Sequence, residues 1–279
     1  MRVGPPMWIH AEIPKPAPAR EGVAELPGAR LWYWDTGGTG PAVILLHAGS
    51  QSGAGWGYQQ PVFAAAGFRT IGYSRRGCLG SDAGDPKDPG VAAEDLNNLM
   101  QLLQVPRAHL VAVALGAFYA LDFTLSYPEK VRSLTICSSY LGIDPSEQEY
   151  AEANARLRPK EFEGLPAEFK ELHPSYRAGN PVGLQAWIKL TREAIPGVRI
   201  NQGRTHKLTW ARLEAITHPT LLMTGDGDLY TPPALLRMQA SHMRHAETAV
   251  FVEAGHCANW EQPAAFNERV LAFLRKHPG

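Results

Sequence analysis

The segment 110–117 constrains the fold of this chain of 279 residues more than any other stretch. An apolar, β-branched run ends just before Ala114, and an alanine-rich segment with helical character begins at Leu115. Small residues, Ala112 and Gly116, stand two positions before and two positions after Ala114. This spacing predicts a sharp turn from a buried strand into a helix, because a branched side chain would collide where the two backbones meet.

A strand-to-helix turn of this kind, with the pattern Gly-x-Ser-x-Gly, lifts a serine nucleophile above a sheet. Here Ala114 occupies the serine position. Two later segments supply partners for such a nucleophile. Residues 219–232 read as a buried strand that ends in an acidic loop containing Asp228, and residues 249–256 read as a strand that ends at His256. The order nucleophile, acid, histidine therefore places all three positions at carboxyl ends of predicted strands.

These motifs together resemble the α/β-hydrolase superfamily, and the resemblance extends from about Glu21 to the end of the chain. It implies an α/β fold with a mostly parallel eight-stranded sheet flanked by helices and a helical cap insertion. We expect a proline-rich arm over residues 1–19, a core over 20–139 and 216–279, and a cap over 140–215. In the last segment the alternation of strand and helix stops, and charged helical stretches, prolines and aromatic residues replace it.

The resemblance implies that His256 exchanges protons with the reacting groups and that Asp228 orients its ring. Asp226 is the rival acid. Asp228 is preferred because Pro232 follows it at the interval usual in the family, and Asp226 is expected to shape the turn. The Glu-x-Pro that follows His256 is a further habit of the family.

The loop after the predicted strand at 42–47 is expected to hold half of an oxyanion hole. By position in the family, the backbone N–H of Gly49 is one donor and the N–H of Leu115 is the other. Four side chains are expected to contact the substrate, and these are Ser50, Trp56, Tyr140 and Trp187. Aromatic side chains of a cap pack in its core more often than against a ligand. An aromatic-rich cap nevertheless favours an apolar or aromatic substrate over a sugar or a phosphate.

Asp88 and Pro89 predict the start of a helix, as an N-cap and a first helical residue. Apolar side chains follow at helical spacing, including Leu96, Leu99 and Leu103. This helix is therefore expected to pack on the sheet.

Composition narrows the functional classes. The 27 basic and 27 acidic residues cancel, which argues against nucleic acid and anionic membrane as partners. Three scattered cysteines predict neither a disulfide framework nor a metal site. No apolar run reaches the roughly 18 residues of a membrane span, and no signal peptide is expected. We expect a cytoplasmic protein that binds a small-molecule substrate without a metal or cofactor, and association into a homodimer stays open.

Two explanations of Ala114 stay open. The favoured one is an engineered replacement of the nucleophilic serine that inactivates the protein, and the other is a natural protein without this nucleophile. The first function considered is hydrolysis of an ester, a lactone or an activated C–C bond. The second is a lyase or a cofactor-free oxygenase that uses only the His256–Asp228 base, and the third is a non-catalytic ligand-binding module. The first is the one we expect.

Overall fold

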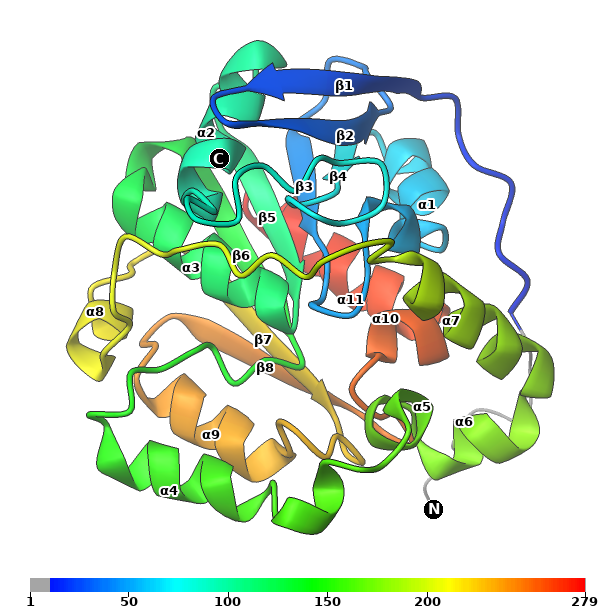
Figure 1. Cartoon of the computed structure of the whole chain (residues 1–279), viewed down its shortest axis with the longest axis vertical. Coiled ribbons are helices and arrows are strands. Elements are labelled where there is room, and N and C mark those ends of the chain that lie inside the picture. The colour runs from blue at the N-terminus through cyan, green and yellow to red at the C-terminus, as the bar shows by residue number, and fades with distance from the viewer. Residues whose placement is uncertain (1–10, 279) are drawn as a thin grey trace.

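An eight-stranded sheet forms the centre of the computed structural model, which describes residues 11–278 of the chain (Figure 1). Across the sheet the strands follow the order β1-β2-β4-β3-β5-β6-β7-β8. β2 pairs antiparallel with both β1 and β4, and all other neighbours pair parallel. The strands are β1 (Arg20–Leu26), β2 (Ala29–Asp35), β3 (Ala42–Leu46), β4 (Arg69–Tyr73), β5 (Ala108–Val113), β6 (Val131–Cys137), β7 (Thr220–Gly225) and β8 (Ala246–Phe251).

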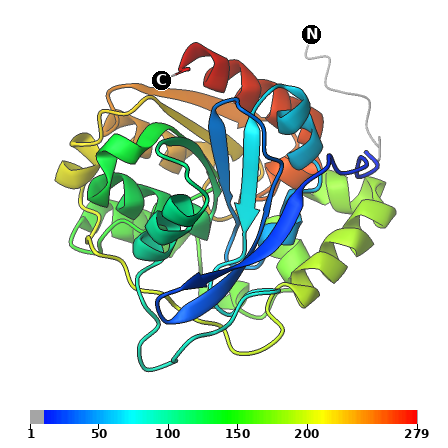
Figure 2. The ribbon, with the colours of Figure 1, turned by 90° about the horizontal axis from the view of Figure 1, so that it is seen from above.

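Helices cover both faces of this sheet (Figures 1 and 2). One face packs against α2, α3 and α9, and the other packs against α1 and α11. The bounds of these helices are α1 (Gln60–Ala65), α2 (Ala92–Leu102), α3 (Leu115–Ser126), α9 (Pro233–Ser241) and α11 (Pro263–Lys276), with the short α10 (Ala258–Glu261) before the last. The mostly parallel sheet flanked by helices is the fold expected from the sequence.

The central strands are apolar on both sides because both of their faces are covered. In β5 the side chains of Leu110 and Ala112 enter one apolar cluster, and those of Val111 and Val113 enter the other. All four are at most 1% exposed. The unbroken apolar run before Ala114 therefore supplies two cores at once, since successive side chains of a strand point to opposite faces.

The order of the strands sets the place of a site. From β3 the chain moves to β4 on one side, and β5 then returns to pair with β3 on the other side. Such a reversal leaves a crevice at the carboxyl ends of the two strands, where open α/β sheets bind their ligands. The loop after β3 and the turn after β5 both begin at this crevice.

A helical insertion (residues 140–215) lies between β6 and β7 and comprises five α-helices. They are α4 (Gln148–Arg156), α5 (Ala167–Glu171), α6 (Pro174–Gly179), α7 (Pro181–Glu193) and α8 (Trp210–Glu214). Of all the helices described between residues 11 and 278, none is long and apolar enough to span a membrane.

The expected N-terminal arm is described from residue 11 onward, and residues 1–10 lie outside the described part of the chain. Residues 11–19 form no regular structure. Ala17 exchanges two hydrogen bonds of 2.9 Å with the side chain of Gln60, and the hydroxyl of Tyr58 donates to the carbonyl of Ala11. This part of the arm therefore lies against the start of α1.

The helix expected to start at Asp88 begins instead at Ala92. Asp85 and Asp88 pair across a short turn, and Val91 forms a bridge with Gly203. Val91 is consequently extended, with φ −107° and ψ 124°, and stands at the N-cap without a side-chain cap. The tertiary pairing with a distant segment overrides the local capping signal at Asp88.

Candidate active site

The turn between β5 and α3 has the strained geometry of an elbow. Ala114 has φ 49° and ψ −116°, a conformation that costs a non-glycine residue about 1–3 kcal/mol. A Cβ atom added at Gly116 would lie 2.3 Å from the carbonyl oxygen of Leu46 and 2.9 Å from that of His47. Glycine at 116 therefore lets α3 start directly against the end of β3.

His256 and Asp228 form a buried pair. The Nδ1 atom of His256 lies 3.0 Å from each carboxylate oxygen of Asp228. The backbone N–H groups of Tyr230 and Thr231 donate to the same carboxylate at 2.8 and 3.0 Å, and the hydroxyl of Thr224 lies 3.1 Å from it. These contacts fix the carboxylate. Because Nδ1 faces Asp228, Nε2 is the ring atom positioned for proton transfer.

The electrostatics of the pair favour a charged carboxylate beside a basic ring. Burial disfavours the charged ring of His256, but the charge and hydrogen bond of Asp228, helped by Glu171, raise its pKa above the ordinary value. Burial also opposes the charge of Asp228, but His256 and two backbone N–H groups lower the pKa of this carboxyl. The pair can therefore stabilise an imidazolium while His256 holds a proton.

The loops that carry the pair touch each other closely. A Cβ atom at Gly225, the last residue of β7, would lie 2.0 Å from the carbonyl oxygen of Ala254. Only glycine permits this approach, which brings the acidic loop beside the histidine loop. Asp226 is exposed and accepts the backbone N–H of Glu253 at 2.8 Å, so its carboxylate shapes the turn.

His47 and Arg75 hold the loop after β3 in place through hydrogen bonds to its backbone. The Nε2 atom of His47 accepts the backbone N–H of Arg75 at 3.1 Å, so Nδ1 donates to the carbonyl of Ala48 at 2.8 Å. Burial, together with the charge of Arg75, holds the pKa of His47 well below its usual range. The guanidinium of Arg75 donates to the carbonyls of His47 and Ala48. His47 is thus a neutral structural group.

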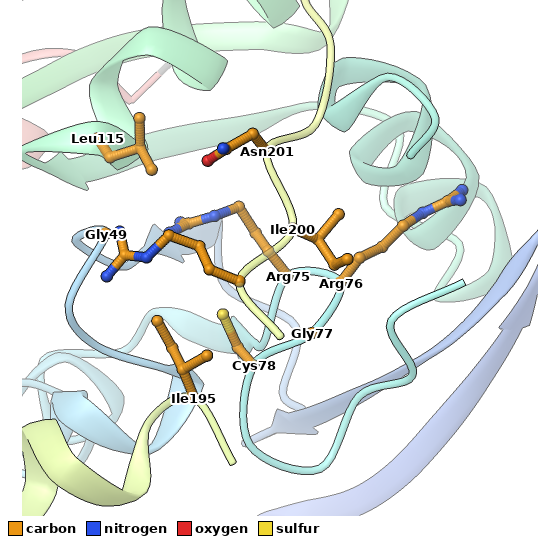
Figure 3. Close-up of a pocket in the computed structure, with 10 residues that line it drawn as sticks. Gly49, Arg75, Arg76, Gly77, Cys78, Leu115, Ile195, Ile200 and Asn201 are labelled. Carbon is orange, nitrogen blue, oxygen red and sulfur yellow. The ribbon is translucent and has the colours of Figure 1, made fainter. Parts of the chain in front are cut away.

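The two expected oxyanion donors lie at one place. A Cβ atom on Gly49 would be 3.2 Å from Cδ2 and 3.4 Å from Cβ of Leu115. Leu115 is the first residue of α3, so its N–H has no acceptor within the helix. Gly49 and Leu115 also line one small pocket together (Figure 3).

The four expected substrate contacts fall in two different environments. Ser50 is partly exposed, and its hydroxyl donates to a carboxylate oxygen of Glu171 at 3.1 Å. Tyr140 is partly exposed and packs edge-on against Phe118. Trp56 and Trp187, by contrast, are each 1% exposed and pack in two separate apolar clusters. Neither indole lines the pocket beside Gly49, and burial among apolar neighbours explains both of them as core side chains.

Sequence reasoning missed two side chains of the insertion that approach this centre. The carboxylate of Glu171 meets Ser50, and its backbone carbonyl accepts the N–H of His256 at 2.8 Å. The guanidinium of Arg158 lies over the rings of Tyr140 and Tyr230, at 4.3 and 5.2 Å from their centroids. No motif surrounds either residue, so only the folded insertion reveals their positions.

The pocket beside the oxyanion loop is lined by charged as well as apolar side chains. Its walls include Arg75, Arg76 and Asn201 (Figure 3). Arg199 belongs to the same lining. Arg75 and Arg76 come from the loop after β4, and Arg199 and Asn201 come from the insertion.

Comparison with known proteins agrees with this geometry. Residues 43–269 match the model of the alpha/beta hydrolase family, which is most of the chain and includes the elbow and both loops of the pair. The chain belongs to the α/β-hydrolase family.

Several curated relatives of this α/β hydrolase are named as hydrolases of oxo-dienoates. It is 29% identical over 280 residues to a 2-hydroxy-6-oxononadienedioate/2-hydroxy-6-oxononatrienedioate hydrolase of Burkholderia vietnamiensis, covering 88% of this chain and 91% of the relative. It is 28% identical over 272 residues to a 2-hydroxy-6-oxo-6-phenylhexa-2,4-dienoate hydrolase of Comamonas testosteroni, covering 88% and 92%. Homologues with hydrolase names support an enzyme.

Among solved structures, a thermophilic esterase from Thermogutta terrifontis superposes with a TM-score of 0.73. The two chains are 24% identical, and the superposition covers 94% of this chain and 100% of the esterase chain. At this identity the likeness supports the fold alone.

Proposed function

We propose that this site is that of a serine-type hydrolase acting on an ester, a lactone or an activated C–C bond, with Ala114 at the nucleophile position. The observation that carries the proposal is the elbow at Ala114, strained in the manner of a nucleophile turn although alanine gains nothing from it. The names of the relatives favour an activated C–C bond next to a carbonyl group.

The proposed roles follow from the geometry. With a serine at 114, the hydroxyl oxygen attacks the substrate carbonyl while His256 takes the hydroxyl proton through Nε2. Asp228 holds the ring and stabilises its charged form. The N–H groups of Gly49 and Leu115 stabilise the negative charge that develops on the carbonyl oxygen. His256 then returns the proton to the leaving oxygen or carbon.

With Ala114 the same centre lacks the attacking oxygen but keeps its other parts. The oxyanion donors are backbone groups and do not depend on the side chain at 114. We therefore propose that the chain with Ala114 binds its substrate and does not form an acyl intermediate. In this proposal the insertion (residues 140–215) is a cap over the site. Of the four substrate contacts expected from the sequence, Ser50 and Tyr140 remain in the proposal.

The decisive experiment is the substitution Ala114→Ser. Restoring the nucleophile should raise turnover of an activated aryl ester or of a 6-oxo-dienoate on the order of 10⁴ to 10⁶-fold, since the members of a triad act as a unit. Initial rates are measured spectrophotometrically. Adding His256→Ala to Ala114→Ser should abolish the gain, which controls for hydrolysis outside this centre.

A second function is supported by the intact pair itself. A positioned base next to an oxyanion hole can remove a proton from a carbon beside a carbonyl group without any nucleophile. In this case the chain with Ala114 would catalyse deuterium exchange at that carbon, visible by NMR, and His256→Ala would stop it. An Ala114→Ser variant that folds and stays inert on esters and dienoates, beside an exchange-active parent, would overturn the hydrolase proposal.

A further inference from the structure

A second pocket, with a volume of about 320 Å³, lies at the edge of the sheet opposite to the candidate active site. Its lining includes the loop before β3, Arg69 at the start of β4, Arg107 just before β5 and Arg132 at the start of β6. These are the amino ends of four neighbouring strands. The elbow and the His256–Asp228 pair lie at the carboxyl ends, so this pocket is separate from the proposed chemistry.

The lining of this pocket carries unbalanced positive charge. It contains three arginines and no aspartate or glutamate. Arg69 is neutralised, because its Nη2 atom lies 2.6 Å from a carboxylate oxygen of Asp35. Arg107 and Arg132 are partly buried, and neither forms an ion pair within residues 11–278. Two guanidinium groups therefore remain without a counter-ion.

The two unpaired arginines flank one residue pair of the sheet, Ala108 of β5 and Val131 of β6. The Nε–H of Arg107 donates to the carbonyl of Val131 at 3.1 Å, and Nη1 of Arg132 donates to the carbonyl of Pro278 at 2.7 Å. These carbonyls orient the guanidinium groups without cancelling their charges. Both Nη atoms of Arg107 and the Nη2 atom of Arg132 have no acceptor within residues 11–278, and none of them is fully buried. These donors are therefore free for a ligand.

The histidine beside these arginines does not reduce the positive charge and is itself affected by it. His109 is fully buried in β5, and its Nδ1 atom lies 2.8 Å from the hydroxyl of Ser133. Burial, together with the charges of Arg132, His277 and Arg107, lowers the pKa of His109 to about 4. The ring is therefore neutral at pH 7. A neighbouring positive potential disfavours a cation and favours an anion.

The loop between β2 and β3 adds neutral donors to the same pocket. Gly38, Thr39 and Gly40 line it, and their backbone N–H groups have no acceptor within residues 11–278. Gly37 and Gly38 have φ values of 65° and 93°. A Cβ atom at Gly38 would meet nothing within 4 Å, so the space beside the loop is open. Successive N–H groups in turns of this kind form concave surfaces that bind anions.

We propose that this pocket binds the phosphate group of a soluble phosphate monoester through Arg107, Arg132 and the N–H groups of the loop. A phosphate dianion matches two guanidinium groups in charge, whereas a carboxylate matches only one. The volume of about 320 Å³ lies within the range of small-molecule sites, about 300–1,000 Å³, and leaves room for an organic group beside the phosphate. The ligand is not the substrate of the hydrolase, so the proposal does not depend on the proposed function.

Calorimetric titration of the whole chain at pH 8, where phosphate is mostly the dianion, tests the proposal with inorganic phosphate as the probe. We expect a Kd of about 1 mM or lower, and binding of acetate that is about tenfold weaker. Glycerol 3-phosphate should bind at least as tightly as inorganic phosphate, and glycerol should not bind. Raising the salt concentration should weaken the binding of phosphate.

Arg107→Gln and Arg132→Gln should each weaken the binding of phosphate about tenfold or more, because each removes a charge-assisted contact. Arg244→Gln is the matched control, since Arg244 is an exposed arginine that does not line the pocket. That variant loses the same charge and should keep the affinity. Melting curves verify that the variants are folded, and if one of the two pocket variants is unfolded, the other decides.

The proposal is wrong if neither phosphate nor glycerol 3-phosphate binds the parent, or if acetate binds as tightly as phosphate. It is also wrong if the folded pocket variants keep the affinity, as they would if phosphate bound at the oxyanion hole, or if Arg244→Gln loses as much as they do. Vesicles of phosphatidylcholine with phosphatidic acid distinguish a lipid source. Sedimentation with these vesicles that Arg107→Gln abolishes, without binding of glycerol 3-phosphate, would replace the soluble ligand with a lipid headgroup and refute the proposal.

Discussion

The contact between Gly116 and the end of β3 allows a test of the elbow that needs no substrate. In the variant Gly116→Ala, the new methyl group would lie 2.3 Å from the carbonyl oxygen of Leu46 and 2.8 Å from its carbon. Both atoms belong to the backbone, so no side-chain rotation can relieve the contact. β3 is held on one side by β4 and on the other by β5, and it cannot move away alone.

The magnitude follows from two opposing effects. Overpacking a buried site costs typically 1–3 kcal/mol and sometimes more, and the rigid surroundings of Gly116 place it at the upper end. Alanine in a helix is about 1 kcal/mol more favourable than glycine, which offsets part of the loss. We expect a net decrease of about 2 kcal/mol in the free energy of unfolding. For a domain of this size that is a fall of roughly 4–8 °C in Tm.

The assay is a pair of thermal and urea unfolding curves followed by circular dichroism. Gly164→Ala is the control, since a Cβ atom there meets nothing within 4 Å and the change should stay within about 0.5 kcal/mol. If Gly116→Ala unfolds at the same temperature as Gly164→Ala, the close approach of α3 to β3 does not exist and the elbow geometry is wrong.

Three further outcomes concern the pair and its surroundings. In the Ala114→Ser background, Asp228→Asn should lower kcat about 10⁴-fold by leaving the wrong tautomer of His256, as measured with an aryl ester. Glu171→Gln should shift the acidic limb of the kcat/KM profile of that variant to lower pH, because Glu171 helps to raise the pKa of His256. Burial raises the pKa of Glu261 to about 8 from 4.5. The folded protein therefore holds this proton more tightly than the unfolded chain does. The free energy of unfolding is highest below pH 4.5 and falls as pH rises towards 8, by up to about 1.4 kcal/mol per pH unit. Glu261→Gln should flatten this pH dependence, as measured by urea unfolding.

The parts of the fold that sequence predicts are those set by short-range patterns. Windows of about ten residues suffice to recognise three features of the sequence. They are the unbroken apolar run of β5, the small residues around Ala114, and the loops that end at Asp228 and His256. The structure places each of them at the carboxyl edge of the sheet. The edge strand β1 has no such pattern, because only Ala24 of its seven residues is fully buried, and it is absent from the sequence-based expectation.

The parts that sequence does not predict depend on contacts between distant segments. Ser50 and Glu171 are 121 positions apart, and nothing local marks either as a partner of the other. Arg199 lies in a segment of the insertion without regular structure, so periodicity carries no information about where its guanidinium ends.

The hydrogen bond from the N–H of His256 to the carbonyl of Glu171 has a consequence for the order of assembly. Glu261 accepts the N–H groups of Gly255 and Cys257 on the histidine loop and of His173 on the insertion. The loop that carries His256 is therefore shaped partly by a segment more than 80 residues earlier in the chain. Contacts of such long sequence separation carry a loop-closure cost that must be met before they form. The loop of His256 therefore reaches its place only when the insertion has packed against it.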